Sequence, residues 1–146
     1  MIAIASDHAG VELKRALCEV ILASGREVRD LGPADTTSVD YPDFAHRVAD
    51  AVLSGEVAIG VLICGTGIGM SLSANRHPGV RAALCHDAFT AEMARRHNDA
   101  NVLCVGARVT GLGVAEQIVR IFLDTPFEGG RHQRRVERIE IEREGS

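Results

Sequence analysis

Residues 58–70 read Ala-Ile-Gly-Val-Leu-Ile-Cys-Gly-Thr-Gly-Ile-Gly-Met, an apolar run that ends in a cysteine and continues into a glycine-rich segment. A short apolar run is typical of a buried strand, and glycines directly after it indicate a tight turn into a helix. Each such run in this chain is followed by a segment with helical spacing, which is the alternation that parallel βαβ units produce. The other apolar runs lie at 2–6, 27–31, 80–85 and 101–105.

The segments between these runs carry apolar residues at the spacing of a helix. In residues 9–24, Leu17 and Ile21 share one face, and Pro42 suits the first turn of the next helix. Further helices are expected at 68–76, 88–97 and 111–124. Helices that connect parallel strands cover both faces of the sheet. The sequence therefore predicts a single domain over 1–146, a three-layer α/β/α sandwich, Rossmann-like in outline, with a five-stranded parallel sheet.

The C-terminal residues follow a different pattern. Residues 129–146 are strongly charged at helical spacing and have few apolar positions. A helix of this kind adds little to the core of its own chain. We therefore expect an extra C-terminal helix at about 129–144 that packs on a partner subunit. Residues 32–41 are the one long loop that the pattern predicts.

Composition excludes several classes of protein. Hydrophobic residues make up 46% of the chain and charged residues 25%, which is typical of a globular protein. The net charge of -4 gives no basic surface for nucleic acid. No stretch approaches the roughly 20 apolar residues that span a bilayer, and the chain begins with a strand-like segment in place of a charged leader. We expect a cytoplasmic protein that binds neither nucleic acid nor membrane.

The cysteines do not form a metal-binding or disulfide pattern. The chain has four cysteines and no C-x-x-C pair. We expect reduced cysteines and no metal site. Cys64 alone has surroundings that suggest chemistry, because it ends an apolar run and precedes three glycines in five positions.

Ligands of open parallel sheets bind outside the carboxyl ends of the strands, so the candidate residues are those at strand ends. The glycine-rich segment 64–69 can turn backbone N–H groups around an anion, and it can equally be a tight turn with close packing. Donors of this kind would stabilise a thiolate on Cys64 and make it a base or nucleophile. The alternative is a buried, inert cysteine. His97 and Asn98, just before the last apolar run, were grouped with these strand-end residues.

The other polar candidates also have structural explanations. Asp7 and His8 can be the N-cap of the first helix with a neighbouring surface imidazole. His97 and Asn98 suit the C-terminus of a helix. Arg131 and Arg135 are four residues apart, so they repel each other unless an anion such as a phosphate lies between them. The alternative for the arginines is a solvated helix neutralised by Glu128, Glu137 and Glu142.

Six motifs, taken together, resemble one family over nearly the whole chain. In chain order they are Ser-Asp-His-Ala-Gly at 6–10, Asp-Tyr-Pro at 40–42, Cys-Gly-Thr-Gly-Ile-Gly at 64–69, Arg-His-Asn-Asp at 96–99, Gly-Ala-Arg at 106–108 and Gly-Gly-Arg-His-Gln-Arg-Arg-Val at 129–136. The family is the type B ribose-5-phosphate isomerases, with their galactose-6-phosphate and allose-6-phosphate isomerase relatives. One departure is Arg76, where lysine is common in the family.

The resemblance implies an aldose-ketose isomerase that interconverts ribose 5-phosphate and ribulose 5-phosphate through a cis-enediolate, without cofactor or metal. Cys64 resembles the base, and His97 resembles the residue that opens the sugar ring. Since a branch of the family has Ser at the cysteine position and Glu at the position of Ile68, the thiol version is implied here. The enediolate loop is implied to be Gly65, Thr66, Gly67, Ile68 and Gly69. The sugar is implied to lie against Asp7, His8 and Tyr41, and the phosphate against Arg108, Arg131 and Arg135.

The resemblance also implies a homodimer with shared active sites. The segments that carry Asn98 and Arg108 are expected to come from the partner chain. Whether dimers pair further into tetramers stays open.

Two other functions remain as alternatives. One keeps the reaction and changes the substrate to a six-carbon sugar phosphate, allose 6-phosphate or galactose 6-phosphate. The other is a non-catalytic sugar-phosphate or nucleotide sensor on the same scaffold. A dinucleotide-dependent oxidoreductase is a weaker third, because the glycine spacing at 65–69 lacks the usual acidic ribose-binding residue on a following strand.

Overall fold

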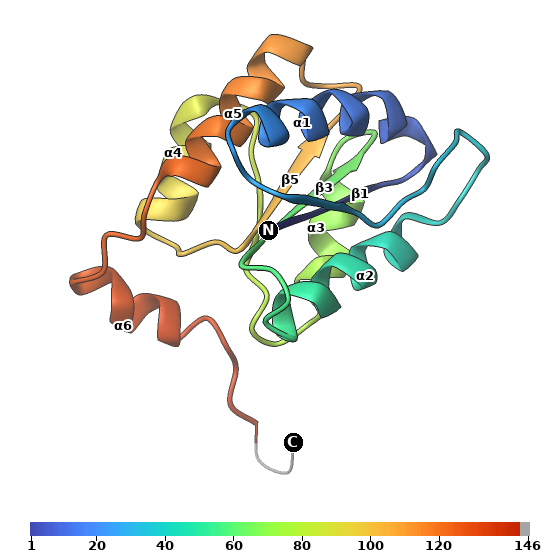
Figure 1. Cartoon of the computed structure of the whole chain (residues 1–146). Helices are drawn as coiled ribbons and strands as arrows, with labels where there is room; N and C mark the ends of the chain where they lie inside the picture. The colour runs from blue at the N-terminus through green and yellow to red at the C-terminus, as the bar shows by residue number, and fades with distance from the viewer. Residues whose placement is uncertain (144–146) are drawn as a thin grey trace.

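The computed structural model describes residues 1–143, and its centre is one parallel sheet (Figure 1). The sheet has five strands in the order β2-β1-β3-β5-β4, and every neighbouring pair is parallel. The strands are β1 (Ile2–Ser6), β2 (Val28–Asp30), β3 (Ile59–Cys64), β4 (Ala82–Leu84) and β5 (Val102–Gly106). Each strand lies at one of the five apolar runs, so the predicted five-stranded parallel sheet is confirmed.

Helices cover both faces of the sheet and make the expected three layers. One face carries α1, α4 and α5, and the other carries α2 and α3. The helices are η1 (His8–Gly10), α1 (Val11–Ala23), α2 (Tyr41–Leu53), α3 (Ile68–Ala74), α4 (Ala88–Arg96), α5 (Leu112–Asp124) and α6 (Arg131–Glu137). No helix among residues 1–143 has the length and apolar character needed to cross a membrane.

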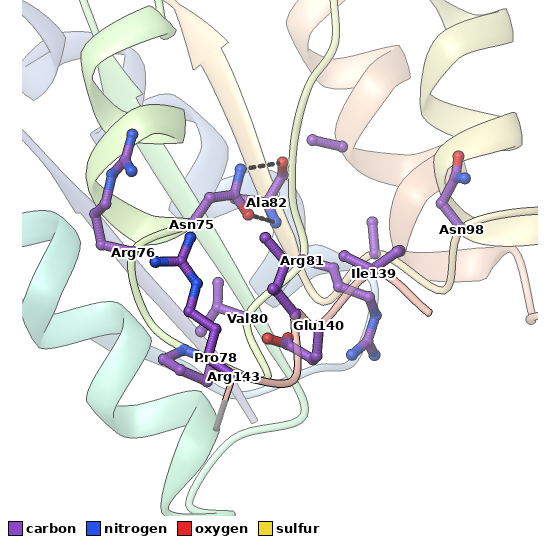
Figure 2. A pocket seen from close by; sticks show the side chains of 13 residues that line it. Asn75, Arg76, Pro78, Val80, Arg81, Ala82, Asn98, Ile139, Glu140 and Arg143 are labelled. Atoms are coloured by element: carbon purple, nitrogen blue, oxygen red, sulfur yellow. Dashed lines mark hydrogen bonds between the residues drawn. The ribbon is translucent and has the colours of Figure 1, made fainter. Parts of the chain in front are cut away.

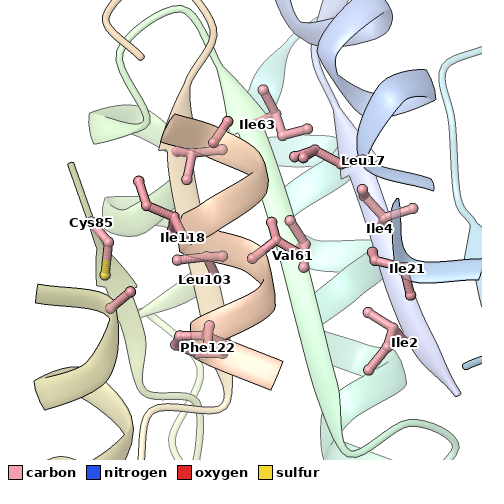
Figure 3. Close-up of a cluster of buried hydrophobic side chains, with 14 of the residues drawn as sticks. Ile2, Ile4, Leu17, Ile21, Val61, Ile63, Cys85, Leu103, Ile118 and Phe122 are labelled. Carbon is pink, nitrogen blue, oxygen red and sulfur yellow. The ribbon is translucent and has the colours of Figure 1, made fainter. Parts of the chain in front are cut away.

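The two cores follow from the alternation of side chains along each strand. In β3, Val61 and Ile63 enter the core under α1, α4 and α5, which Figure 3 shows from close by. Leu62 and Cys64 enter the core under α2 and α3. The last residue of β3 therefore belongs to the second core and lies directly before α3.

The order of the strands creates a crevice between β1 and β3. The chain leaves β1 toward α1 on one face and leaves β3 toward α3 on the other. Ligand sites of open parallel sheets lie at such a point, outside the carboxyl ends of the strands. We call this side the carboxyl end of the sheet, and we call the side where the strands begin the amino end.

The C-terminal helix is shorter than predicted. The expected helix at about 129–144 is α6, which spans Arg131–Glu137, and residue 144 lies outside the described residues. Only His132 of α6 is buried. Residues 138–143 are exposed, so little burial offsets the entropy of ordering further helical turns.

Candidate active site

Cys64 ends β3 with its sulfur facing a backbone donor. The Gly67 N–H donates a hydrogen bond to Cys64 Sγ over 3.1 Å. A donor aimed at sulfur stabilises a thiolate more than a thiol. Cys64 is 5% exposed, as expected for a buried cysteine. It is therefore buried and also in contact with a backbone donor.

The glycine-rich loop after Cys64 is tightly packed as well as rich in donors. Gly67 has φ +80°, which favours glycine, and a Cβ there would lie 3.0 Å from the backbone carbon of Val105. The Ile68 N–H donates to the Thr66 hydroxyl over 3.3 Å. The loop is therefore closely packed, as the tight-turn interpretation predicted, and two of its N–H groups donate to side chains of the loop itself. Its use as an anion-binding loop stays a prediction.

The end of β5 lies against this loop. The Ala107 N–H donates to the Cys64 carbonyl over 2.8 Å, and the Arg108 N–H donates to the Gly65 carbonyl over 2.9 Å. The guanidinium of Arg108 lies over Gly65, where Nη1 is 3.5 Å from the position of a Cβ. A positive charge thus lies next to the loop that begins with Cys64.

The end of β1 brings two more predicted residues to the same place. The Asp7 N–H donates to the Ile63 carbonyl over 3.0 Å. The Asp7 carboxylate caps η1 by accepting from the Ala9 N–H over 2.9 Å, as the N-cap interpretation predicted. His8 follows, half-buried.

Tyr41 reaches the loop from α2. Its ring carbons lie 2.7 Å from where a Cβ on Gly69 would be, so only glycine allows this approach. Tyr41 is 41% exposed. Its ring therefore forms part of an open wall beside the loop. The predicted residues that meet at the carboxyl end of the sheet are Asp7, His8, Tyr41, Cys64, Gly65, Thr66, Gly67, Ile68, Gly69 and Arg108.

The remaining predicted residues form a second group. His97 caps the C-terminus of α4, and its N–H donates to the Met93 carbonyl over 2.9 Å, as the helix-end interpretation predicted. Its ring stacks on the ring of His132, with 4.3 Å between centroids and 12° between planes. A cavity of about 400 Å³ lies beside this stack. It is lined by His97, Asn98, His132, Arg135, Val136 and Ile139. Arg131, at the start of α6, is exposed.

The two groups lie at opposite ends of the sheet. His97 and Asn98 precede β5, whereas Cys64 is the last residue of β3, and the two strands are parallel. A five-residue strand spans about 16 Å at roughly 3.3 Å per residue. Figure 1 shows α6 beyond the ends where the strands begin, far from their arrowheads. The grouping of His97 and Asn98 with the carboxyl strand ends was therefore wrong for a single chain.

Arg108 also differs from its expected grouping. It was paired with Asn98 as a segment contributed by the partner. In one chain Arg108 lies over Gly65, in the group of Cys64, while Asn98 lies with His97. The reason is topological, because one residue follows β5 and the other precedes it.

The other three cysteines have raised pKa values. All four cysteines are free. Burial raises the pKa of Cys85 to about 11. Burial also raises the pKa of Cys104 strongly and that of Cys18. Mostly buried cysteines were predicted, and three of the four are buried.

One group among residues 1–143 has the composition of a metal site, and its geometry is unsuited to one. The ligand atoms of His97, Glu128 and His132 lie within 4.8 Å of one another. The two imidazole planes are nearly parallel, 12° apart. Because nitrogen lone pairs lie in the ring plane, parallel stacked rings do not direct them at a common point. The arrangement is a stacked pair rather than a chelate.

A larger pocket, of about 670 Å³, lies away from Cys64 (Figure 2). Arg76 and Arg81 line it together with residues of the C-terminal segment, among them Ile139 and Glu140. Glu140 of that segment accepts a hydrogen bond from the Gly79 N–H over 2.7 Å. Asn98 is the only predicted site residue in its lining among the described residues, so the pocket is not the expected catalytic site.

The structure adds two residues to which the sequence analysis gave no role. His132 stacks on His97, and the Val39 N–H contacts His8. The position of His132 among Arg131, Arg134 and Arg135 gave one usable signal, since a histidine amid arginines is the side chain of this helix that can be neutral or charged near pH 7.

The sequence matches a known family model over nearly its whole length. The model is described as Ribose/Galactose Isomerase and matches residues 2–139. Curated relatives are similar over the same span. The putative sugar phosphate isomerase YwlF of Bacillus subtilis is 52% identical over 139 residues, which is 94% of this chain and 93% of the relative. Ribose-5-phosphate isomerase B of Escherichia coli is 47% identical over 138 residues, 94% of this chain and 93% of the relative.

Solved structures of similar proteins have the same fold. The ribose-5-phosphate isomerase B of Clostridium thermocellum superposes with a TM-score of 0.93 at 51% identity, covering 94% of this chain and 93% of the other. The enzyme of Thermotoga maritima gives a TM-score of 0.92 at 51% identity, covering 94% and 95%.

Proposed function

This chain belongs to the ribose/galactose isomerase family, and from that premise we propose that it interconverts ribose 5-phosphate and ribulose 5-phosphate. Family membership makes it an aldose-ketose isomerase. The observation that carries the proposed reaction is the hydrogen bond from the Gly67 N–H to Cys64 Sγ, over 3.1 Å, in the loop that lies against the end of β5. It places a thiol that would act as the base beside the loop whose donors would stabilise an oxyanion.

The proposed proton transfer begins on the open-chain aldose. The C2–H bond breaks toward the sulfur of Cys64, its electron pair forms a C1=C2 bond, and the negative charge moves to the C1 oxygen. The thiol then returns its proton to C1. A proton passes from the C2 oxygen to the C1 oxygen, and C2 becomes the ketone. Donors of residues 65–69 and the Thr66 hydroxyl would stabilise the enediolate.

Ring opening needs a second group near the anomeric carbon. His97 is the proposed group: it would take the proton from the C1 hydroxyl and give one to the ring oxygen as the C1–O4 bond breaks. Arg131 and Arg135 would hold the phosphate, since guanidinium groups match phosphate oxygens. Asn98 lines the same cavity as His97 and Arg135.

The two groups work together only if a second copy of the chain is present. His97 lies at the amino end of the sheet and Cys64 at the carboxyl end. A two-fold dimer can place the amino end of one chain against the carboxyl end of the other and complete two sites. The exposed apolar side chains near the carboxyl end are consistent with such an interface, since Ile68, Leu72, Val109 and Leu112 are each more than half exposed.

A mixing experiment tests the shared site. Cys64→Ala and His97→Ala homodimers should each be inactive. After they are mixed and allowed to exchange subunits, each mixed dimer would have one site with both defects and one with neither. A random mixture should recover about a quarter of wild-type activity. No recovery, with subunit exchange demonstrated by a mass tag, would refute the shared site.

A panel of substrates tests the reaction itself. The kcat/KM values for ribose 5-phosphate, allose 6-phosphate and galactose 6-phosphate should be compared, each with and without EDTA. We expect the pentose phosphate to be preferred and EDTA to have no effect. Preference for a hexose phosphate would favour the second candidate, which the family description, covering galactose as well as ribose isomerases, keeps open. Binding without hydrogen exchange at C2 in deuterated water would indicate a sensor.

A further inference from the structure

We propose that His132 is a positioning residue that holds the imidazole of His97 by stacking on it and ties the orientation of His97 to the two arginines of α6. The inference rests on the proposed function and goes beyond it, because it assigns a role to a residue outside the substrate-contacting set. The contact between His132 and His97 would also couple phosphate binding to ring opening.

The stack is the main packing contact of α6. His132 is 5% exposed and is the only buried residue of Arg131–Glu137. Its ring lies 4.3 Å from the ring of His97, with 12° between the planes. A helix with one buried side chain has its rotation about its own axis set mainly by that side chain.

A second contact holds the start of α6 at the same place. The Glu128 N–H donates to the Arg96 carbonyl over 3.0 Å, one residue before His97. The Glu128 carboxylate lies 3.7 Å from His132 Nε2, too far for a hydrogen bond. The backbone bond and the ring stack together join the end of α4 to the beginning of α6.

The arginines move with His132 because they share its helix. Arg131 precedes it directly, and Arg135 lies three residues later, about one turn along the helix. Arg135 lines the same cavity of about 400 Å³ as His97 and His132. A phosphate held by the arginines would therefore fix α6, and through the stack it would fix the ring of His97.

Burial and the charges around His132 favour its neutral form, which suits a ring that stacks on His97. Burial lowers the pKa of His132, and positive charge on His97, Arg131 and Arg135 lowers it further, while Glu128 raises it. A neutral ring can stack closely on His97 without repelling the proton that His97 carries during ring opening. Its buried Nε2 makes no hydrogen bond to any described residue, so the ring is held by packing.

Two substitutions test this role. His132→Ala removes the stack, and His132→Phe keeps an aromatic ring without a titratable group. Gln133→Ala, at the neighbouring exposed position of α6, is the control. We expect His132→Ala to lower kcat for ribose 5-phosphate about 100-fold, the size of effect that a small misplacement of a reacting group produces. His132→Phe should restore most of this loss, and Gln133→Ala should change nothing.

A second measurement separates positioning from general damage. Ribulose 5-phosphate is an open chain, because its C5 oxygen is esterified and cannot close a five-membered ring on C2. Exchange of its C1 hydrogen with deuterated water needs the base and no ring opening. In His132→Ala we expect the exchange rate at saturating ribulose 5-phosphate to match wild type, with a raised KM.

The outcomes are distinct. The positioning role is wrong if His132→Ala leaves kcat for ribose 5-phosphate unchanged, if exchange falls in parallel with it, or if His132→Phe is as impaired as His132→Ala. Lack of exchange in the wild-type enzyme with any pentose phosphate would instead refute the proposed function.

Discussion

The Val39 N–H donates a hydrogen bond to Nδ1 of His8 over 3.2 Å. This bond joins the loop before α2 to the segment just after β1. Because Nδ1 accepts, a neutral His8 carries its proton on Nε2. The loop thus sets which nitrogen can donate to a ligand at the carboxyl end of the sheet.

Substitutions of His8 can separate the loop contact from the ligand contact. His8→Asn places an acceptor oxygen close to the position of Nδ1 and lacks the Nε2 donor. We expect a raised KM for ribose 5-phosphate and an unchanged rate of proteolytic cleavage in residues 34–40. His8→Ala should show the raised KM together with faster cleavage, because the Val39 N–H loses its partner. Equal cleavage of the two variants would contradict the contact.

Cys64→Ala should abolish turnover while substrate still binds. Positioned bases contribute about 10² to 10⁴ in rate, so we expect a loss of kcat of that size or larger, measured with ribose 5-phosphate. Substrate affinity, measured by calorimetry, should change little. The matched control is Cys104→Ala, which removes a fully buried thiol of the same core. If the control lost kcat as Cys64→Ala does, the effect would be structural.

Gly106→Ala should distort the enediolate loop. A Cβ on Gly106 would lie 2.6 Å from the backbone carbon of Thr66, so the loop must move. We expect a fall in kcat of about 100-fold, since loop donors are displaced from the reacting oxygen. Gly113→Ala is the control, because a Cβ there has no atom of a described residue within 4 Å. A normal kcat in Gly106→Ala would show that the loop tolerates the shift.

Lys14 and Asp30 form an ion pair whose two halves should differ in their effect on stability. Lys14 Nζ is buried and contacts Asp30 Oδ1 at 2.8 Å and the Pro33 carbonyl at 2.6 Å. Asp30→Ala leaves a buried charge without its counter-ion and should lower the free energy of unfolding by about 3 kcal/mol. Lys14→Met removes the charge and keeps the volume, so it should cost about 1 kcal/mol.

Urea unfolding at one protein concentration measures both Lys14 and Asp30 variants, since a dimer's stability depends on concentration. We expect Asp30→Ala to lose more free energy of unfolding than Lys14→Met. The opposite order would show that the lysine stem, rather than its charge, provides the stabilisation.

Stability should fall at alkaline pH because of Cys85. Burial raises its pKa from 9.0 to about 11 in the folded chain. Below pH 9 the thiol is neutral in both states, and its contribution is fully present. Between pH 9 and about 11 the unfolded chain loses this proton first, so the free energy of unfolding decreases by roughly 2 to 3 kcal/mol. Chemical unfolding of wild type and Cys85→Ala across this range should show a smaller decrease in the variant; identical slopes would contradict the assignment.

Much of the fold was readable from short stretches of sequence. The run that ends at Cys64 became β3 with little change, and the glycines after it became the turn into α3. The edge strands β2 and β4 came out shorter than their apolar runs. An edge strand has a neighbour on one side only. The end residues Glu27, Leu31 and Cys85 still form a backbone hydrogen bond to that neighbour, but they lie outside the strands.

Other features depended on packing between distant segments. The place of β5 between β3 and β4 has no signal in the residues of β5 itself. The C-terminal charge pattern continues past Glu137, but helix α6 ends there and residues 138–143 are exposed. The role assigned to Tyr41 stays a prediction, though its ring does lie against Gly69.

By itself, the sequence determined the local chemistry: strands where apolar residues run together, and a thiol joined to a glycine-rich turn. These properties are encoded within a few consecutive residues, because they depend on side-chain periodicity and backbone freedom. The tertiary structure alone decided that His97 and Cys64 lie at opposite ends of the sheet. Strand direction and order arise from pairing between segments far apart in the chain, and they determine which side chains can meet within one molecule and which can meet only across two.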